Sequence, residues 1–215
     1  MEEQHYTYIM ASELSMIETK VKKSRFIGVV FPVETQKQVA EALADLRKSN
    51  KNAKHIAYAY LLGENYSIAK SSDDGEPEGS AGAPIYQALR EKHITNTLVA
   101  VVRYFGGIEL GKSKLTSVYY TTAQNALNNS KKIMMVYFNI FEIKVSYNYF
   151  AALSKVLTES GFEILERNFE ESMPMIKCAI PADTSEKFLM DIRMRFKEGT
   201  HMTKVGSKYY RNEFE

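Results

Sequence analysis

The sequence is poor in the residues that would tie the protein to an oxidising compartment or to a membrane. It contains a single cysteine, Cys178, so no disulfide can form within the chain. The longest apolar run extends only from Leu98 to Val102, whereas a helix that crosses a bilayer needs about 20 such residues. The first residues also lack the basic and apolar segments of a signal peptide. These absences predict a soluble, cytoplasmic protein.

Neither sign of charge dominates, because 28 basic residues stand against 26 acidic ones and the net charge is +2. This balance excludes a whole-molecule attraction to nucleic acid or to an acidic membrane, so any anion-binding surface must be a local patch. Tryptophan is absent, but 14 tyrosines and 11 phenylalanines supply large side chains for a core. A chain of 215 residues, 45% of them hydrophobic, is long enough for one large domain or two small ones.

Strand and helix patterns alternate along the first part of the chain. Residues 1–24 are polar and end in a basic cluster that continues into the next residue: Lys20, Lys22, Lys23 and then Arg25. Residues 25–33 are β-branched or aromatic and predict a strand, and Thr35 is a suitable N-cap for the helix that follows. Further strands are predicted at residues 55–62, 66–70 and 96–105, and further helices at residues 84–92 and 111–129.

A polar segment at residues 130–132 marks the predicted boundary between two domains, residues 1–130 and residues 131–215. The second part has the order strand, helix, strand, strand, helix, strand, at residues 136–145, 148–160, 162–169, 173–181, 183–197 and 202–210. This βαββαβ order is typical of the ferredoxin-like fold. The sequence therefore predicts an α+β protein whose second domain is ferredoxin-like.

The strongest local pattern is the glycine-rich segment at residues 106–113, which follows an apolar strand and opens a helix. It fits G-x-x-x-x-G-K-[ST], the phosphate-binding loop of nucleotide hydrolases. No later predicted strand ends in the aspartate that would hold the metal of such an enzyme, which weakens that interpretation. Two other interpretations of this segment stay open. One is an anion site at the start of the helix, and the other is a tight turn that glycine alone permits. The residues expected in the anion site are Arg103, Gly106, Gly107, Gly111, Lys112, Ser113 and Lys114.

A second polar segment, residues 71–83, is rich in glycine, serine, proline and acids, and predicts a loop. Its carboxylates Asp73, Asp74 and Glu76 could bind a divalent cation or act as a general base. The alternative is a solvated turn, because their spacing does not fit the calcium-loop pattern. His55 opens a predicted strand, where a hydrogen-bonded structural role competes with catalysis. The sequence predicts no metal centre and no cofactor.

Four segments in this order resemble the amino-terminal domain of the IMPACT/YigZ family: residues 23–27 (KSRFI), 54–60 (KHIAYAY), 72–82 (SDDGEPEGSAG) and 102–111 (VRYFGGIELG). The resemblance covers about residues 20–127, and the two loop motifs together are specific to the family. Residues 135–215 resemble the second domain of bacterial members, which is similar to the last domain of elongation factor G. Where the family usually continues L-G-T-G-G-L, this chain has Lys112, Ser113 and Lys114, which create the nucleotide-loop match and add positive charge.

The resemblance implies more about the fold than about the function. It implies that the first domain is an α/β sandwich like the second domain of a ribosomal protein, with helices on one side of a four-stranded sheet. Eukaryotic members restrain a starvation-sensing kinase through an extra amino-terminal domain that this chain lacks, so that mechanism is not carried over. Both folds recur in ribosome-associated proteins, which makes RNA or the ribosome the expected partner by analogy.

The preferred function is a non-enzymatic, translation-associated protein that binds RNA, the ribosome or another phosphate-bearing ligand. Besides the anion site, it would use Lys204, Lys208 and Tyr210, which fall on one face of the last predicted strand by a period of two. An ordinary solvated sheet face is the alternative for these three residues.

Two hypotheses of other classes stay open. One is a metal-dependent hydrolase of a phosphorylated small molecule, in which the carboxylates of residues 73, 74 and 76 hold the metal and His55 is the base. The other is a regulatory module that binds a protein partner through the polar first 24 residues or the open sheet of the second domain.

Overall fold

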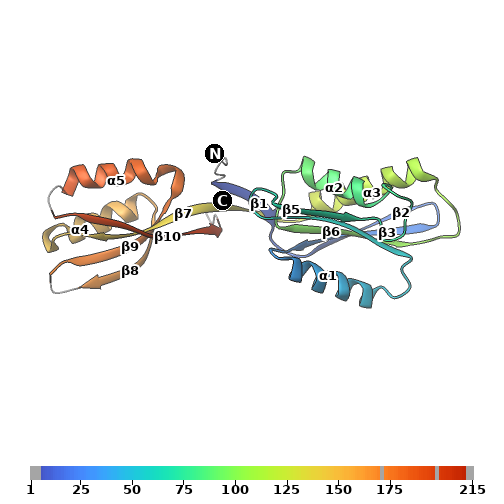
Figure 1. The fold of residues 1–215 in the computed structure, drawn as a ribbon, viewed down its shortest axis with the longest axis horizontal. Helices are drawn as coiled ribbons and strands as arrows, with labels where there is room; N and C mark the ends of the chain where they lie inside the picture. Colours follow the sequence, from blue (N-terminus) through green and yellow to red (C-terminus); the bar gives the residue numbers. More distant parts are fainter. Residues whose placement is uncertain (1–5, 170–171, 197–198, 212–215) are drawn as a thin grey trace. The chain divides into compact units, whose positions relative to one another are not determined.

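The computed structural model describes residues 6–169, 172–196 and 199–211. The chain divides into two compact units: the first unit is Tyr8–Met134, and the second unit joins Met1–Thr7 to Met135–Glu215. Each unit contains a sheet and its own helices (Figure 1), so the predicted α+β fold is confirmed. Within the described part of the chain, no helix combines the length and the apolar character needed to span a membrane.

The first unit is built on a five-stranded antiparallel sheet in the order β2-β3-β6-β4-β5. Its strands are β2 (Ser15–Val21), β3 (Ser24–Pro32), β4 (His55–Leu62), β5 (Ile68–Ser72) and β6 (Thr97–Tyr104). Helix α1 (Gln36–Ser49) covers one face, and α2 (Gly82–Glu91) and α3 (Lys112–Asn129) cover the other (Figure 1). The expectation of four strands with helices on one side is therefore wrong.

Successive residues of the central strands point alternately to the two helix layers. Phe26 and Val30 of β3 belong to the core that α2 and α3 cover. Ile27 and Val29, between them in sequence, pack with Leu46 of α1. A sheet covered on both faces needs strands that are apolar at nearly every position, which explains the continuous apolar runs in this half of the sequence.

Helix α1 begins where the sequence predicted. Thr35 accepts a hydrogen bond from the backbone N–H of Gln38 at 3.2 Å, and the Gln38 side chain accepts one from the Thr35 N–H at 3.1 Å. This reciprocal capping box satisfies two N–H groups that the first turn of a helix leaves without partners. The predicted N-cap is therefore confirmed.

Strand β2 lies in the polar amino-terminal stretch, where no strand was predicted. Ile17 and Val21 pack against the core under α3, whereas Glu18 and Lys20 between them are exposed. This alternation is typical of a half-buried strand, and charged outer residues suit a strand at the edge of a sheet. The polar composition of the stretch concealed its period of two.

The second unit has the predicted βαββαβ order. Its elements are β7 (Lys132–Lys144), α4 (Tyr147–Glu159), β8 (Glu163–Phe169), β9 (Pro174–Pro181), α5 (Ala182–Phe196) and β10 (His201–Arg211). The strands lie in the order β10-β7-β9-β8, the ferredoxin-like arrangement. The remaining strand, β1 (Thr7–Ala11), spans the residue at which the chain passes from the second unit to the first. Leu153 and Leu157 of α4 and Ile192 of α5 pack with Ile176 and Cys178 of β9 in one core.

Close packing of α3 on β3 depends on Gly28. A Cβ at this position would lie 2.9 Å from the Ala126 Cβ and 3.0 Å from the Thr122 carbonyl oxygen. We expect Gly28→Ala to lower the free energy of unfolding by roughly 1–3 kcal/mol, because the helix and the strand must separate. The measurement is the urea midpoint of the first unit.

Gly206→Ala is the matched control, because an added Cβ there meets only the Ile140 Cδ1, at 3.9 Å. Its effect should stay within about 0.5 kcal/mol. Equal losses in the two variants would contradict the packing argument.

Candidate functional site

The acidic and glycine-rich loops meet in a pocket of about 350 Å³ in the first unit. The acidic loop supplies Gly75, Glu76 and Pro77, and the glycine-rich loop supplies residues 109–112. The remaining lining residues are Lys54, His55, Arg103, Phe105 and Leu115. His55 opens β4 directly opposite Arg103 near the end of β6, so the sheet register brings the two loops to one place. The sequence alone did not establish this meeting.

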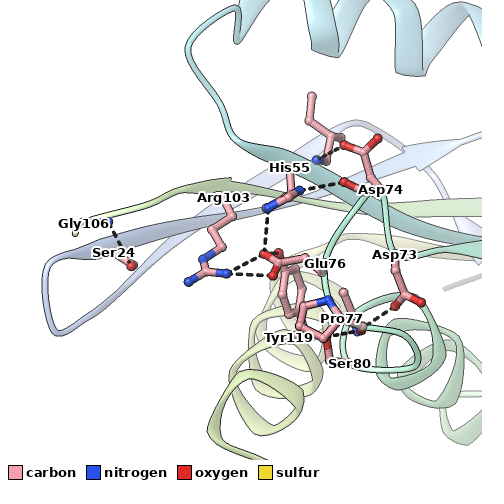
Figure 2. A network of polar contacts seen from close by, with 12 residues as sticks. Ser24, His55, Asp73, Asp74, Glu76, Pro77, Ser80, Arg103, Gly106 and Tyr119 are labelled. Carbon is pink, nitrogen blue, oxygen red and sulfur yellow. Dashed lines mark hydrogen bonds and ion pairs between the residues drawn. The ribbon is translucent and has the colours of Figure 1, made fainter. Parts of the chain in front are cut away.

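Glu76 is the centre of a buried polar network (Figure 2). The Arg103 Nη1 donates to both Glu76 carboxylate oxygens, at 2.6 and 2.8 Å, and the Tyr119 hydroxyl donates to Oε1 at 2.7 Å. Glu76 and Arg103 are only 7% and 6% exposed. Burial, reinforced by the neighbouring Glu76 charge, raises the pKa of Tyr119, so its hydroxyl keeps the proton that it donates. Glu76 is thus a structural anion that holds the acidic loop against β6.

Asp74 and His55 attach the acidic loop to the start of β4. The Asp74 Oδ2 accepts from the Ile56 backbone N–H at 2.6 Å and forms an ion pair with Arg47. The His55 Nδ1 lies 2.7 Å from the Asp74 carbonyl oxygen (Figure 2). Because a carbonyl only accepts, Nδ1 carries the hydrogen of this contact, and Nε2 is the other polar atom of the ring. That nitrogen lies 3.9 Å from Glu76 Oε1, on the lining of the pocket.

Asp73 fixes the start of α2 from outside the helix. Its oxygens accept from the backbone N–H groups of Gly79, Ala81 and Gly82 at 2.8–2.9 Å. Partial burial opposes its ionisation, but the three N–H donors outweigh that effect and lower the pKa of Asp73 below its usual value. Asp73 therefore acts as an ionised helix cap.

The three carboxylates of the acidic loop therefore turn to three separate sets of partners. Asp73 binds N–H groups, Asp74 binds Arg47 and Ile56, and Glu76 binds Arg103. In residues 6–169, 172–196 and 199–211, no three His, Cys, Asp or Glu side chains are placed to hold a metal ion together. Because the three side chains turn to separate partners, the described residues do not support the interpretation in which these carboxylates hold one catalytic metal together.

The glycine-rich loop approaches the β2–β3 turn too closely for any side chain. A Cβ on Gly106 would lie 2.1 Å from the carbonyl carbon and oxygen of Lys23, and the Gly106 N–H donates to the Ser24 Oγ at 3.2 Å. Gly107 and Gly111 have φ angles of 82° and 79°, in the left-handed region that glycine adopts without strain. The predicted tight turn is present at these positions.

The same loop leaves the start of α3 open. Gly111 is the N-cap residue and, as a glycine, has no side chain with which to cap the helix. Lys112 and Lys114 are exposed in the first turn and form no ion pair with another described residue, and Ser113 is exposed between them. Free N–H groups at a helix start attract anions. The geometry of a turn and the chemistry of an anion site therefore coexist here.

Several residues of the pocket escaped the sequence analysis. Phe105 is 39% exposed and lies under the Lys54 Nζ, which is 4.7 Å from the ring centroid. Lys54 directly precedes His55 and Phe105 directly precedes Gly106, both of them predicted residues, and that adjacency was the available signal. Tyr119 gave no signal, since its partner Glu76 lies 43 residues away.

The last predicted group, Lys204, Lys208 and Tyr210, does not share one face of β10. A bulge between Lys204 and Gly206 shifts the register, so Lys204 pairs with Phe141 while Lys208 pairs with Phe138. Cross-strand partners point to the same face and neighbours alternate, so Lys204 faces the helix-covered side and the other two face away. The prediction of one basic-aromatic face is wrong, because the bulge adds a residue that a period of two ignores.

Comparison with known proteins identifies relatives that match most of the chain. Residues 22–127, which include every residue of the pocket, match the Impact N-terminal domain family. The chain is 32% identical over 168 residues to IMPACT family member YvyE of Bacillus subtilis, covering 78% of this chain and 77% of that protein. It is 25% identical over 182 residues to IMPACT family member YigZ of Escherichia coli, covering 84% and 88%.

A solved structure, described as the crystal structure of a hypothetical protein, has the same fold. It matches with a TM-score of 0.63 at 20% identity, over 94% of this chain and 99% of that chain.

Removal of the Asp73 charge should make stability less dependent on acidity. Because the folded pKa lies below the ordinary 3.8, the charge stabilises the fold above that pH, and the stabilisation is lost as pH falls through the folded pKa. We expect Asp73→Asn to cost about 1 kcal/mol near pH 7 and progressively less below pH 4. Urea unfolding of both proteins between pH 3 and pH 7 measures this difference; a pH-independent gap would refute the charged cap.

Removal of Arg103 should leave the Glu76 carboxylate buried without its ion pair. We expect Arg103→Ala to lower the free energy of unfolding by about 3–5 kcal/mol, and Arg103→Met with Glu76→Gln to lower it by less. Arg25→Ala is the control, because its pair with Glu18 at 3.0 Å is solvent-exposed and worth about 0–1 kcal/mol. Similar urea midpoints for the Arg103 and Arg25 variants would disprove the central role of the buried pair.

Proposed function

The chain belongs to the IMPACT family, and we propose that it is a non-enzymatic, cytoplasmic protein that acts in translation by binding the phosphates of RNA in the pocket of its first unit. The observation that carries this proposal is the uncapped start of α3, which opens onto a pocket lined by Lys54 and Lys112. The N-terminus of a helix carries about half a positive charge and presents free N–H groups. Phosphate is the common biological anion that such a site accommodates best.

The charge of the pocket supports an anionic ligand. Arg103 is neutralised by its pair with Glu76, so the effective charges on the lining are Lys54, Lys112 and Glu109. Lys114, which directly precedes the pocket residue Leu115, adds a further exposed positive charge. The site is therefore cationic although the whole chain is nearly neutral. On such a chain an anion-binding surface has to be a local patch of this kind.

An exposed aromatic ring favours RNA over a simple anion. Phe105 lies on the lining of the pocket beside the lysine that covers its ring. Unstacked bases of single-stranded RNA stack on such rings, and each contact contributes about 1–3 kcal/mol.

The commitment of the reactive groups supports binding rather than catalysis. Glu76 and the two aspartates are engaged in the fold, and His55 is held by its Nδ1. Cys178 lies in the core of the second unit, where burial raises the pKa of its thiol to about 12. A buried free thiol is also consistent with a reducing cytoplasm.

The proposal is tested by the binding of a labelled single-stranded RNA and by cosedimentation with ribosomes. We expect Lys112→Gln with Lys114→Gln to weaken RNA binding by roughly tenfold or more at about 0.1 M salt, since each lysine releases counterions when it contacts a phosphate. Arg103 is kept intact because its loss would perturb the fold.

Lys37→Gln with Lys70→Gln provides the matched control. It removes the same charge from exposed positions on α1 and on β5, the strand at the opposite edge of the sheet from β2. Equal losses in both variants, or binding that does not depend on salt, would count against the site.

A further inference from the structure

The β2–β3 turn carries two lysines to the outer side of the glycine-rich loop. Lys22 and Lys23 are the two turn residues between the paired Val21 and Ser24. The Lys23 main chain lies against Gly106, and the Lys22 Nζ lies 3.5 Å from the Glu109 carbonyl oxygen. Two segments more than 80 residues apart in the sequence are thus held side by side, with Gly106 N–H bonded to Ser24 across 82 residues.

The two turn lysines are available for a ligand, unlike the other members of the amino-terminal basic cluster. Lys20 and Arg25 both pair with Glu18, at 3.7 and 3.0 Å. Lys22 and Lys23 are exposed and pair with no carboxylate of the described residues. The basic cluster therefore divides into a pair bound within the hairpin and a pair facing solvent beside the glycine-rich loop.

Lys22 also occupies an unfavourable backbone position. Its φ is 52°, in the left-handed region, where asparagine and glycine are accommodated more readily than lysine. A lysine at this φ makes the folded state less stable than asparagine or glycine would. The two-residue turn requires the positive φ, and the lysine that occupies it is exposed beside the glycine-rich loop.

We propose that the β2–β3 turn is a second phosphate subsite, so that one RNA strand runs from the pocket over the glycine-rich loop to Lys22 and Lys23. This inference rests on the proposed function of the pocket. A Cβ on Gly107 would meet no other atom within 4 Å, so the loop is open at this point between the two subsites and an RNA backbone can pass close to the protein. Ile108, 40% exposed in the same loop, adds an apolar surface beside this path. Cations spread along a path suit a polyanion better than a small phosphorylated molecule.

The test is the salt dependence of single-stranded RNA binding in a variant that keeps the turn. Lys22→Asn with Lys23→Gln removes both charges, and asparagine tolerates the positive φ. If each lysine neutralises one phosphate, the slope of log K against log salt should become shallower by about 1.4, and affinity should fall roughly tenfold or more at about 0.1 M salt. Lys22→Arg with Lys23→Arg should bind like the wild type, because charge is retained.

The outcomes separate the turn from the pocket. A slope within error of the wild type, with affinity changed less than twofold while the Lys112 and Lys114 variant loses binding, would overturn the turn subsite and leave the pocket proposal intact. Absence of RNA binding by the wild type would overturn both. A loss equal to that of the Lys37 and Lys70 control would reduce the effect to net charge and also overturn the subsite. Thermal midpoints at or above that of the wild type exclude misfolding as the cause.

Discussion

The buried pair between Glu76 and Arg103 is the interaction on which the rest of the site depends. A carboxylate and a guanidinium removed from water lose much hydration, so the pair contributes less to net stability than its short distances suggest. The pair is important because of its position, since it joins the acidic loop to the end of β6. The Tyr119 hydroxyl adds a donor from α3, so one carboxylate ties together the loop, the sheet and the helix that opens the pocket. The Glu76–Arg103 pair therefore fixes the wall of the pocket that the acidic loop forms.

The opposite wall is held by close backbone contact instead of charge. Gly106 lets the glycine-rich loop touch the β2–β3 turn, and the hydrogen bond to Ser24 keeps the two aligned. The start of α3 and the turn lysines therefore have a fixed relation to each other within the first unit. The turn lysines form no ion pair with a carboxylate of the described residues, so their charges can serve a phosphate backbone.

In the second unit, the basic residues of β10 are divided between the two faces of the sheet. Its core is the ferredoxin-like packing of two helices on one sheet face, with Cys178 buried among aliphatic side chains. The bulge in β10 sends Lys204 to the helix-covered side and leaves Lys208 beside Tyr210 on the other. Basic residues that looked like one surface are thus divided, and the concentrated cationic patch of the described chain lies in the first unit.

Local patterns by themselves determined the order of helices and strands from residue 25 onward, the N-cap at Thr35 and the ferredoxin-like unit, because these depend on neighbours within a few residues. Loop motifs also pointed to the family and to the segments of the site. Tertiary structure alone decided that Glu76 meets Arg103 and Tyr119, that Asp73 caps a helix instead of binding a metal, and that Lys22 and Lys23 lie beside Gly106. Most of those contacts join residues that are distant in the chain. They depend on the register of the sheet and on the conformation of the loops. A local pattern contains neither, because both result from how the whole core packs.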